Sequence, residues 1–166
     1  MIALQITSLK IFMNQLLAGD AFDIFLLEGA TVSTANTYTI DGHINPEFYP
    51  PEERTNENIP YPLKPWREIK GMCFNLMKGK HTPLYFKFIF HLKPEHMTSI
   101  LSGENVLFDP QTLKALVLTV KYDGSKAVLI TGSAHHNFMM SKEPESIWDK
   151  VLPAYLTSKG ITYEHL

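Results

Sequence analysis

The basic side chains of this chain are concentrated in one stretch of the sequence. Residues 64–93 contain seven lysines and arginines and a single acid, Glu68, a local charge of +6 within a chain of formal net charge −2. Such a separation of charge typically faces a ligand or partner of opposite sign. An amphipathic helix expected here, together with the loop that follows it, brings four basic side chains to one outer face: Arg67, Lys78, Lys80 and His81. We therefore predict a contact surface there for an anionic ligand or an acidic protein segment.

The same residues also have an ordinary structural explanation. Lysines in the last turn of a helix complement the helix dipole, and single charges on an outer helix face are commonly just solvated. Gly71 lies in the middle of the expected helix, where glycine costs roughly 1 kcal/mol relative to alanine. It would leave room for a close neighbour or a ligand. The sequence leaves both explanations open.

Ser133, His135 and His136 supply a catalytic alternative. An enzyme acting on a small anionic substrate would hold the anion with Lys80 and use His135 or His136 as the acid or base, which requires these groups to converge on one pocket. However, Ser133 does not lie in a G-x-S-x-G pattern, no acid is placed by the sequence to orient either histidine, and residues 78–83 depart from the P-loop pattern. We therefore assign no catalytic residue and no cofactor.

Metal and nucleic-acid binding find less support. Asp41 and His43 have the spacing of side chains on one face of a strand, but neither C-x-x-C nor H-E-x-x-H occurs, so we assign no metal site. The aromatic residues between the lysines are expected to lie inside. The sequence pI of about 6.4 also argues against nucleic acid, because domains that bind it typically exceed about 9.

Length and composition indicate a single globular domain spanning residues 1–166. No apolar stretch approaches the roughly 20 residues of a membrane span, and residues 1–6 do not resemble the start of a signal peptide. The single cysteine, Cys73, rules out an internal disulfide and favours a reducing compartment. We therefore expect a cytoplasmic protein without membrane contact.

Hydrophobic periodicity predicts an α+β fold with a largely antiparallel sheet of about five to six strands and three to four helices. The expected helices begin near Ser8, Pro65, Pro94 and Glu143, and the expected strands cover residues 1–7, two parts of 24–42, 84–92, 115–121, 126–131 and 135–140. An Asp123-Gly124 pair predicts a type I′ hairpin turn. Pro153 is expected to kink or restart the last helix.

Residues 45–64 form a loop rich in proline and glutamate. Proline removes backbone donors and restricts the preceding residue, so we expect neither a helix nor a central strand here. The loop carries four glutamates against Arg54. It is therefore a candidate cover for the basic surface within the same molecule.

Several segments together resemble a clostridial family known only as a domain of unknown function (5721-type). The resemblance lies in Asp41-Gly42-His43, in residues 66–83 and 130–133, in the apolar run 22–27 and in Trp148-Asp149. It covers nearly the whole chain and implies a bacterial cytoplasmic protein. Ala134 stands where the family pattern has serine, so no role of a hydroxyl there is carried over. The resemblance supplies no activity, ligand or catalytic residue.

The leading hypothesis is thus a small non-enzymatic binding or regulatory module whose contact surface is Arg67, Lys78, Lys80 and His81. The enzyme with Lys80 and His135 or His136 remains the first alternative. A structural or oligomerising subunit is the second, and an exposed apolar face on the last helix would favour it.

Overall fold

The computed structural model describes residues 1–138 and 141–166. Its helices are α1 (Leu9–Leu17), α2 (Trp66–Met77), α3 (Pro94–Ser102) and α4 (Glu143–Ser158). Its strands are β1 (Ala3–Ile6), β2 (Phe25–Ser33), β3 (Thr37–Asp41), β4 (Lys64–Pro65), β5 (Tyr85–Leu92), β6 (Leu113–Tyr122), β7 (Ala127–His135) and β8 (Tyr163–His165). Three short 3-10 turns cover Pro46–Phe48, Pro51–Glu53 and Pro110–Thr112.

The strands form one sheet in the order β3-β2-β5-β6-β7-β1-β8, with β4 paired to β2. Every pairing between the described strands is antiparallel, which confirms the predicted α+β class. The sheet is larger than the five to six strands predicted, since the described residues contribute eight. Two of these, β4 and β8, have only two and three residues, too few for a hydrophobic period to be visible in the sequence.

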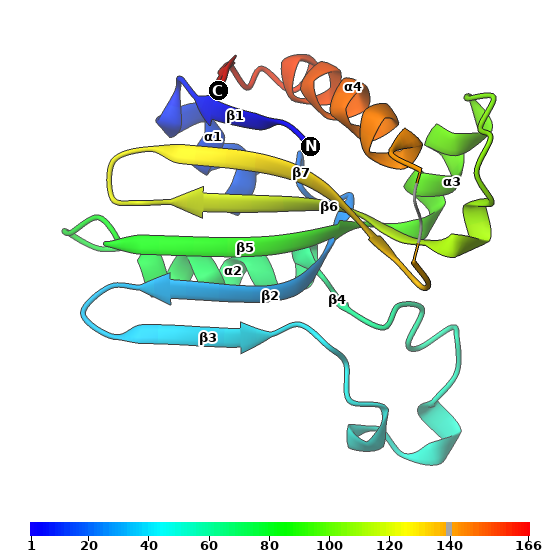
Figure 1. Cartoon of the computed structure of the whole chain (residues 1–166). Helices are drawn as coiled ribbons and strands as arrows, with labels where there is room; N and C mark the ends of the chain where they lie inside the picture. The colour runs from blue at the N-terminus through cyan, green and yellow to red at the C-terminus, as the bar shows by residue number, and fades with distance from the viewer. Residues whose placement is uncertain (139–140) are drawn as a thin grey trace.

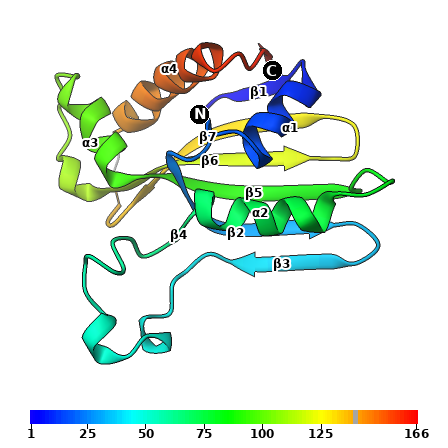
Figure 2. The same ribbon diagram turned by 180° about the vertical axis from the view of Figure 1, so that it is seen from behind.

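The helices cover one face of this sheet and leave the other without a helical layer. Figure 1 looks onto the uncovered face, and Figure 2 shows α1 and α2 lying across the opposite face. The central strand β5 has the alternation that such an arrangement requires. Phe86, Phe88 and Phe90 are fully buried toward the helices, whereas Tyr85, Lys87, Ile89 and His91 are half-buried on the uncovered face.

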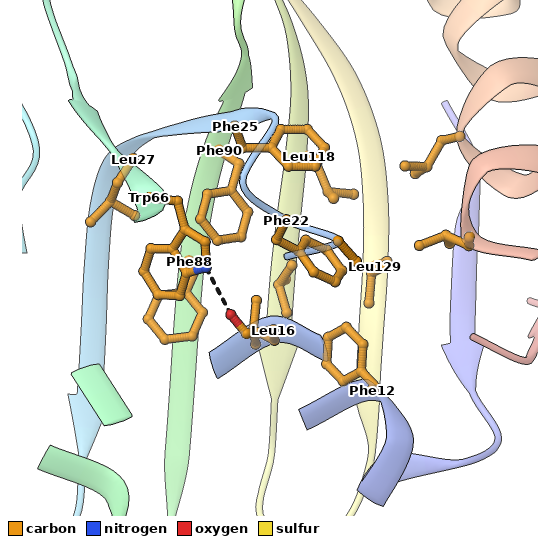
Figure 3. Packing of buried hydrophobic residues seen from close by; sticks show 14 of the residues in the cluster. Phe12, Leu16, Phe22, Phe25, Leu27, Trp66, Phe88, Phe90, Leu118 and Leu129 are labelled. Carbon is orange, nitrogen blue, oxygen red and sulfur yellow. Dashed lines mark hydrogen bonds between the residues drawn. The ribbon is translucent and has the colours of Figure 1, made fainter. Parts of the chain in front are cut away.

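Most of the largest fully buried side chains between sheet and helices are aromatic (Figure 3). Trp66 from α2 packs against Phe88 and Phe90, with ring centroids 5.0 Å apart in each case. Its indole Nε1–H donates to the carbonyl of Leu16 at 2.8 Å, in the last turn of α1 where the helix supplies no donor. Burying a large apolar side chain contributes about 1.5–3 kcal/mol, so this cluster both stabilises the fold and fixes α1 against α2.

One local prediction was wrong, and one of two alternatives for a second is excluded. The β6–β7 hairpin is present, but its loop spans residues 123–126 and no residue other than glycine has a positive φ angle among those described. Asp123 instead accepts hydrogen bonds on Oδ1 from the amides of Ser125 and Lys126, so it organises the turn through its side chain. Helix α4 continues past Pro153 and does not restart there.

The strand predicted over residues 135–140 is not a separate element. β7 extends as far as His135, residues 136–138 belong to no strand, and Met139 and Met140 lie outside the described residues.

Candidate functional site: a groove between two helices

Three of the four predicted contact residues lie together. Lys78, Lys80 and His81 are exposed in the short connection between α2 and β5. Arg67 lies in the first turn of α2, and eleven residues at 1.5 Å each place it about 16 Å from Lys78 along the helix. A Cβ added to Gly71 would meet no heavy atom within 4 Å, so this glycine faces open solvent and makes no close approach. The basic surface is therefore centred on the C-terminal end of α2.

Other lysines of the basic stretch have structural roles. Lys70 Nζ donates to the carbonyl of Gly19 at 2.6 Å and to Asp23 Oδ1 at 2.7 Å, with its side chain only 15% exposed. Lys93 Nζ lies 5.8 Å from the ring centroid of Tyr61, a cation–π distance. Two of the seven basic residues in this stretch, Lys70 and Lys93, therefore make contacts away from the end of α2.

The acidic loop lies at the opposite end of α2 from Lys78. Residues 45–64 lead directly into β4 and the first turn of α2, beside Arg67, so they do not cover the basic helix end. Arg54 binds the loop internally by donating to the carbonyls of Pro46 and Tyr49 at 3.0 and 2.9 Å. Tyr61 donates to a carboxylate oxygen of Glu95 on α3, which raises the pKa of Tyr61 to about 12. The loop is thus fastened to α3.

A groove runs between α1 and α2 where the basic helix end begins. It has a volume of about 380 Å³, and the described residues that line it include no acid. Lys10 of α1 and Lys78 line the groove with mainly apolar residues: Met13, Leu17, Ala18, Phe74, Met77 and Pro83. Phe74 is 44% exposed, an unusual exposure for an aromatic side chain on a packed helix.

This combination can hold an apolar group while two ammonium groups attract negative charge nearby. Neither Lys10 nor Lys78 forms an ion pair with a described carboxylate. Methionines such as Met13 and Met77 adapt their shape to a bound surface. The sequence pattern identified Lys78, but it gave no sign of the α1 side of the groove, which lies some sixty residues earlier in the chain.

Lys80 and the two predicted histidines do not converge. The loop that contains Lys80 leads into the start of β5, near Phe86. Phe86 pairs with Tyr122 of β6, which pairs with Ala127, so the start of β7 lies at the same end of the sheet as Lys80. His135 is eight residues farther along β7, about 26 Å at 3.3 Å per residue, and His136 follows it. Figure 1 shows these two regions at opposite ends of the sheet. A single site using Lys80 with His135 or His136 is therefore excluded by hydrogen-bond reach.

His135 instead belongs to a small polar cluster below α4. Ser133 Oγ lies 3.0 Å from His135 Nε2 and donates to Glu145 Oε1 at 3.2 Å. In a nucleophilic triad the acid binds the second ring nitrogen of the histidine. Here His135 Nδ1 is buried and finds no partner among the described residues, and Glu145 binds the serine. The connectivity is not that of an activated serine.

A second histidine pair was missed in the sequence. His91 Nε2 lies 2.8 Å from Glu28 Oε2, and both residues line a pocket at one end of the uncovered sheet face. His91 occupies an alternating strand position, and Glu28 lies 63 residues earlier, where β2 changes register. A strand pattern alone cannot reveal such a pair.

Asp41 and His43 do converge as their spacing allowed. His43 Nδ1 lies 2.6 Å from Asp41 Oδ1, and hydrogen bonds from the backbone and ring of His43 lower the pKa of Asp41. Among the described residues, no group of three or more histidine, cysteine or acidic side chains is arranged to hold a metal ion.

Two further features limit the chemistry available. Cys73 is fully buried, and desolvation raises the pKa of its thiol to about 11, which disfavours the reactive thiolate. The described part of the chain contains no helix with the length and apolar character needed to cross a membrane. Helix α4 exposes no large apolar side chain, so the face that would favour an oligomerising subunit is absent there; its exposed residues are Ser146, Lys150, Ala154, Thr157 and Ser158.

Comparisons with known proteins identify the family but no characterised relative. No curated protein and no solved structure matches the chain. Residues 15–164, which include α2 and the last three residues of α1, match the family of unknown function DUF5721. The chain belongs to that family.

Proposed function

We propose that this protein is a small cytoplasmic binding module that captures an acidic amphipathic segment of a partner protein in the groove between α1 and α2. The observation that carries the proposal is a groove with an apolar floor, a lysine from each helix and no described acid. The cytoplasmic location rests on the single reduced, buried cysteine.

An amphipathic helix is the occupant whose chemistry fits this groove best. Grooves between helices accept partner helices through apolar side chains spaced i, i+3, i+4 and i+7. Phe74, Met77 and Met13 offer an apolar floor for such side chains. Lys10, Lys78 and the adjacent Lys80 would attract acidic residues that flank the apolar stripe, which favours both encounter and orientation.

The test uses a designed probe, since the natural partner is not identified. A fluorescent 15-residue helical peptide carries leucines on one face and glutamates beside them. A second peptide has the same leucines with lysines in place of the glutamates. We expect fluorescence anisotropy to show binding of the acidic peptide and much weaker binding of the basic one.

The variant Lys10→Glu/Lys78→Glu should weaken binding of the acidic peptide by roughly tenfold or more, because two attractions of about 0.2–1 kcal/mol each become repulsions. The matched control is Lys87→Glu/Lys121→Glu, which makes the same change of charge on the uncovered sheet face. Phe74→Ser tests the apolar floor. Equal binding of the two peptides, or equal losses in the two double variants, would contradict the proposal.

A further inference from the structure

A second pocket lies on the far side of the molecule from the α1–α2 groove. It is lined by residues from one end of β2, β5 and β6 together with His43, Pro62 and Leu63, and it has a volume of about 140 Å³. Its apolar floor includes Leu26, Ala115 and Leu92, which are 2–3% exposed. Its polar groups are Glu28, His91, His43 and Lys114.

The carboxylate of Glu28 determines which ring nitrogen of His91 carries the proton. An ionised carboxylate accepts hydrogen bonds only, so the 2.8 Å contact requires His91 to carry a proton on Nε2. In the neutral imidazole, Nδ1 is then an acceptor, and it forms no hydrogen bond with a described residue. The His91 side chain is only 12% exposed, so its ring is held in place against the pocket.

Lys114 supplies positive charge at the same pocket. It is exposed, and it forms no ion pair with a described carboxylate. Glu28 is already engaged by His91, and Asp41 holds His43 from outside the pocket at 2.6 Å. The ammonium group of Lys114 is therefore the cation that an anionic ligand would meet, and the carboxylate of Glu28 lies in the same pocket bound to His91.

We propose that this pocket binds a small oxyanion that also carries an O–H group. The negative oxygen would pair with Lys114, and the O–H would donate to His91 Nδ1 while Glu28 holds the imidazole from its other side. Monobasic phosphate and short hydroxy acids share this chemistry. A volume of about 140 Å³ lies below the roughly 300–1,000 Å³ of pockets for drug-sized ligands, which suits small ligands of this kind.

The test is an NMR titration of the whole protein with three probes, sodium phosphate, lactate and acetate. Lactate and acetate share a carboxylate, but only lactate adds a hydroxyl donor. We expect phosphate, lactate or both to shift the His91 ring resonances in a saturable way, with acetate at least about tenfold weaker, since a charge-assisted site loses one of its two directed contacts. Phosphate and lactate are separate arms and identify which oxyanion the pocket prefers.

Lys114→Met should weaken binding of the preferred probe by about tenfold or more. Lys121→Met is the matched control, because Lys121 lies on the same strand about 23 Å away and is likewise exposed. His91→Gln should also abolish binding, which for this variant is followed through the backbone amide resonances of the residues that line the pocket. The proposal is overturned if neither phosphate nor lactate shifts His91, if acetate binds as tightly as the preferred probe, or if the two lysine variants lose affinity equally.

Discussion

Gly42 is the position where one added methyl group should damage this fold most clearly. A Cβ at Gly42 would lie 1.8 Å from the carbonyl oxygen of Leu27 and 2.7 Å from its carbon. Both are backbone atoms of β2, so no side-chain rotation can relieve the overlap. Gly42→Ala must therefore push the chain after β3 away from β2.

The loss of folding stability in Gly42→Ala can be estimated from the backbone hydrogen bonds that Gly42 makes to its neighbours. The Gly42 amide donates to the Glu28 carbonyl at 2.9 Å, and the Gly42 carbonyl accepts from Lys64 at 2.8 Å. Losing both at about 1 kcal/mol each, together with some buried contact area, gives about 2–4 kcal/mol. For a domain of this size each kcal/mol corresponds to about 2–4 °C, so the melting temperature should fall by about 4–16 °C.

Gly71→Ala is the matched control, because a Cβ there meets nothing within 4 Å. Replacing an exposed mid-helix glycine should stabilise the protein by roughly 0.5–1 kcal/mol and raise the melting temperature by about 1–4 °C. Thermal unfolding followed by circular dichroism and urea titration measure both variants. A Gly42→Ala protein that melts within about 2 °C of the parent would refute the close packing of this crossing.

Three further predictions follow from single contacts. Lys70→Met should destabilise the protein by about 2–3 kcal/mol in urea unfolding, because Asp23 loses its partner in a partly buried site, whereas Arg67→Met should change stability by less than about 0.5 kcal/mol. Cys73 should react with iodoacetamide at pH 8 at least about 100-fold more slowly in the native than in the unfolded protein, since a thiol of pKa about 11 in place of 9.0 has that much less thiolate; rapid native labelling would contradict its burial. Tyr61→Phe should speed amide hydrogen exchange in residues 45–64 several-fold, because the bond to Glu95 fastens the loop to α3, and unchanged exchange would show that other contacts hold the loop.

The elements of the fold were predictable because their hydrophobic periods are long. The nine-residue β2 and the twelve-residue α2 each repeat their pattern several times, whereas β4 has two residues and offers none. The turn at Asp123 was misjudged for a different reason. The Asp-Gly pair fits several turn types, and the side-chain bonds of Asp123 to two amides decide between them.

The candidate sites were only half predictable, since each joins residues far apart in the chain. Lys78 was visible as a charged helix end, but its partner Lys10 could be found only once α1 was placed beside α2. The position of the acidic loop, residues 45–64, could have been predicted from the sequence. A segment that leads into a helix lies at its first turn, about 16 Å from the end where Lys78 lies. Chain connectivity alone therefore places residues 45–64 near Arg67 and away from Lys78.

The pair of Glu28 and His91 depends on an irregularity that the sequence does record. Phe25 and Leu27 face the core two residues apart, but the next core residues are Ala30 and Val32, a step of three. A regular strand would have turned Ala30 and Val32 outward, so the register shift between Leu27 and Gly29 is what keeps both halves of β2 in the core. The extra residue is Glu28, and the same shift that preserves the core brings its carboxylate to His91 on the uncovered face. The second pocket therefore arises from the geometry that the core itself requires.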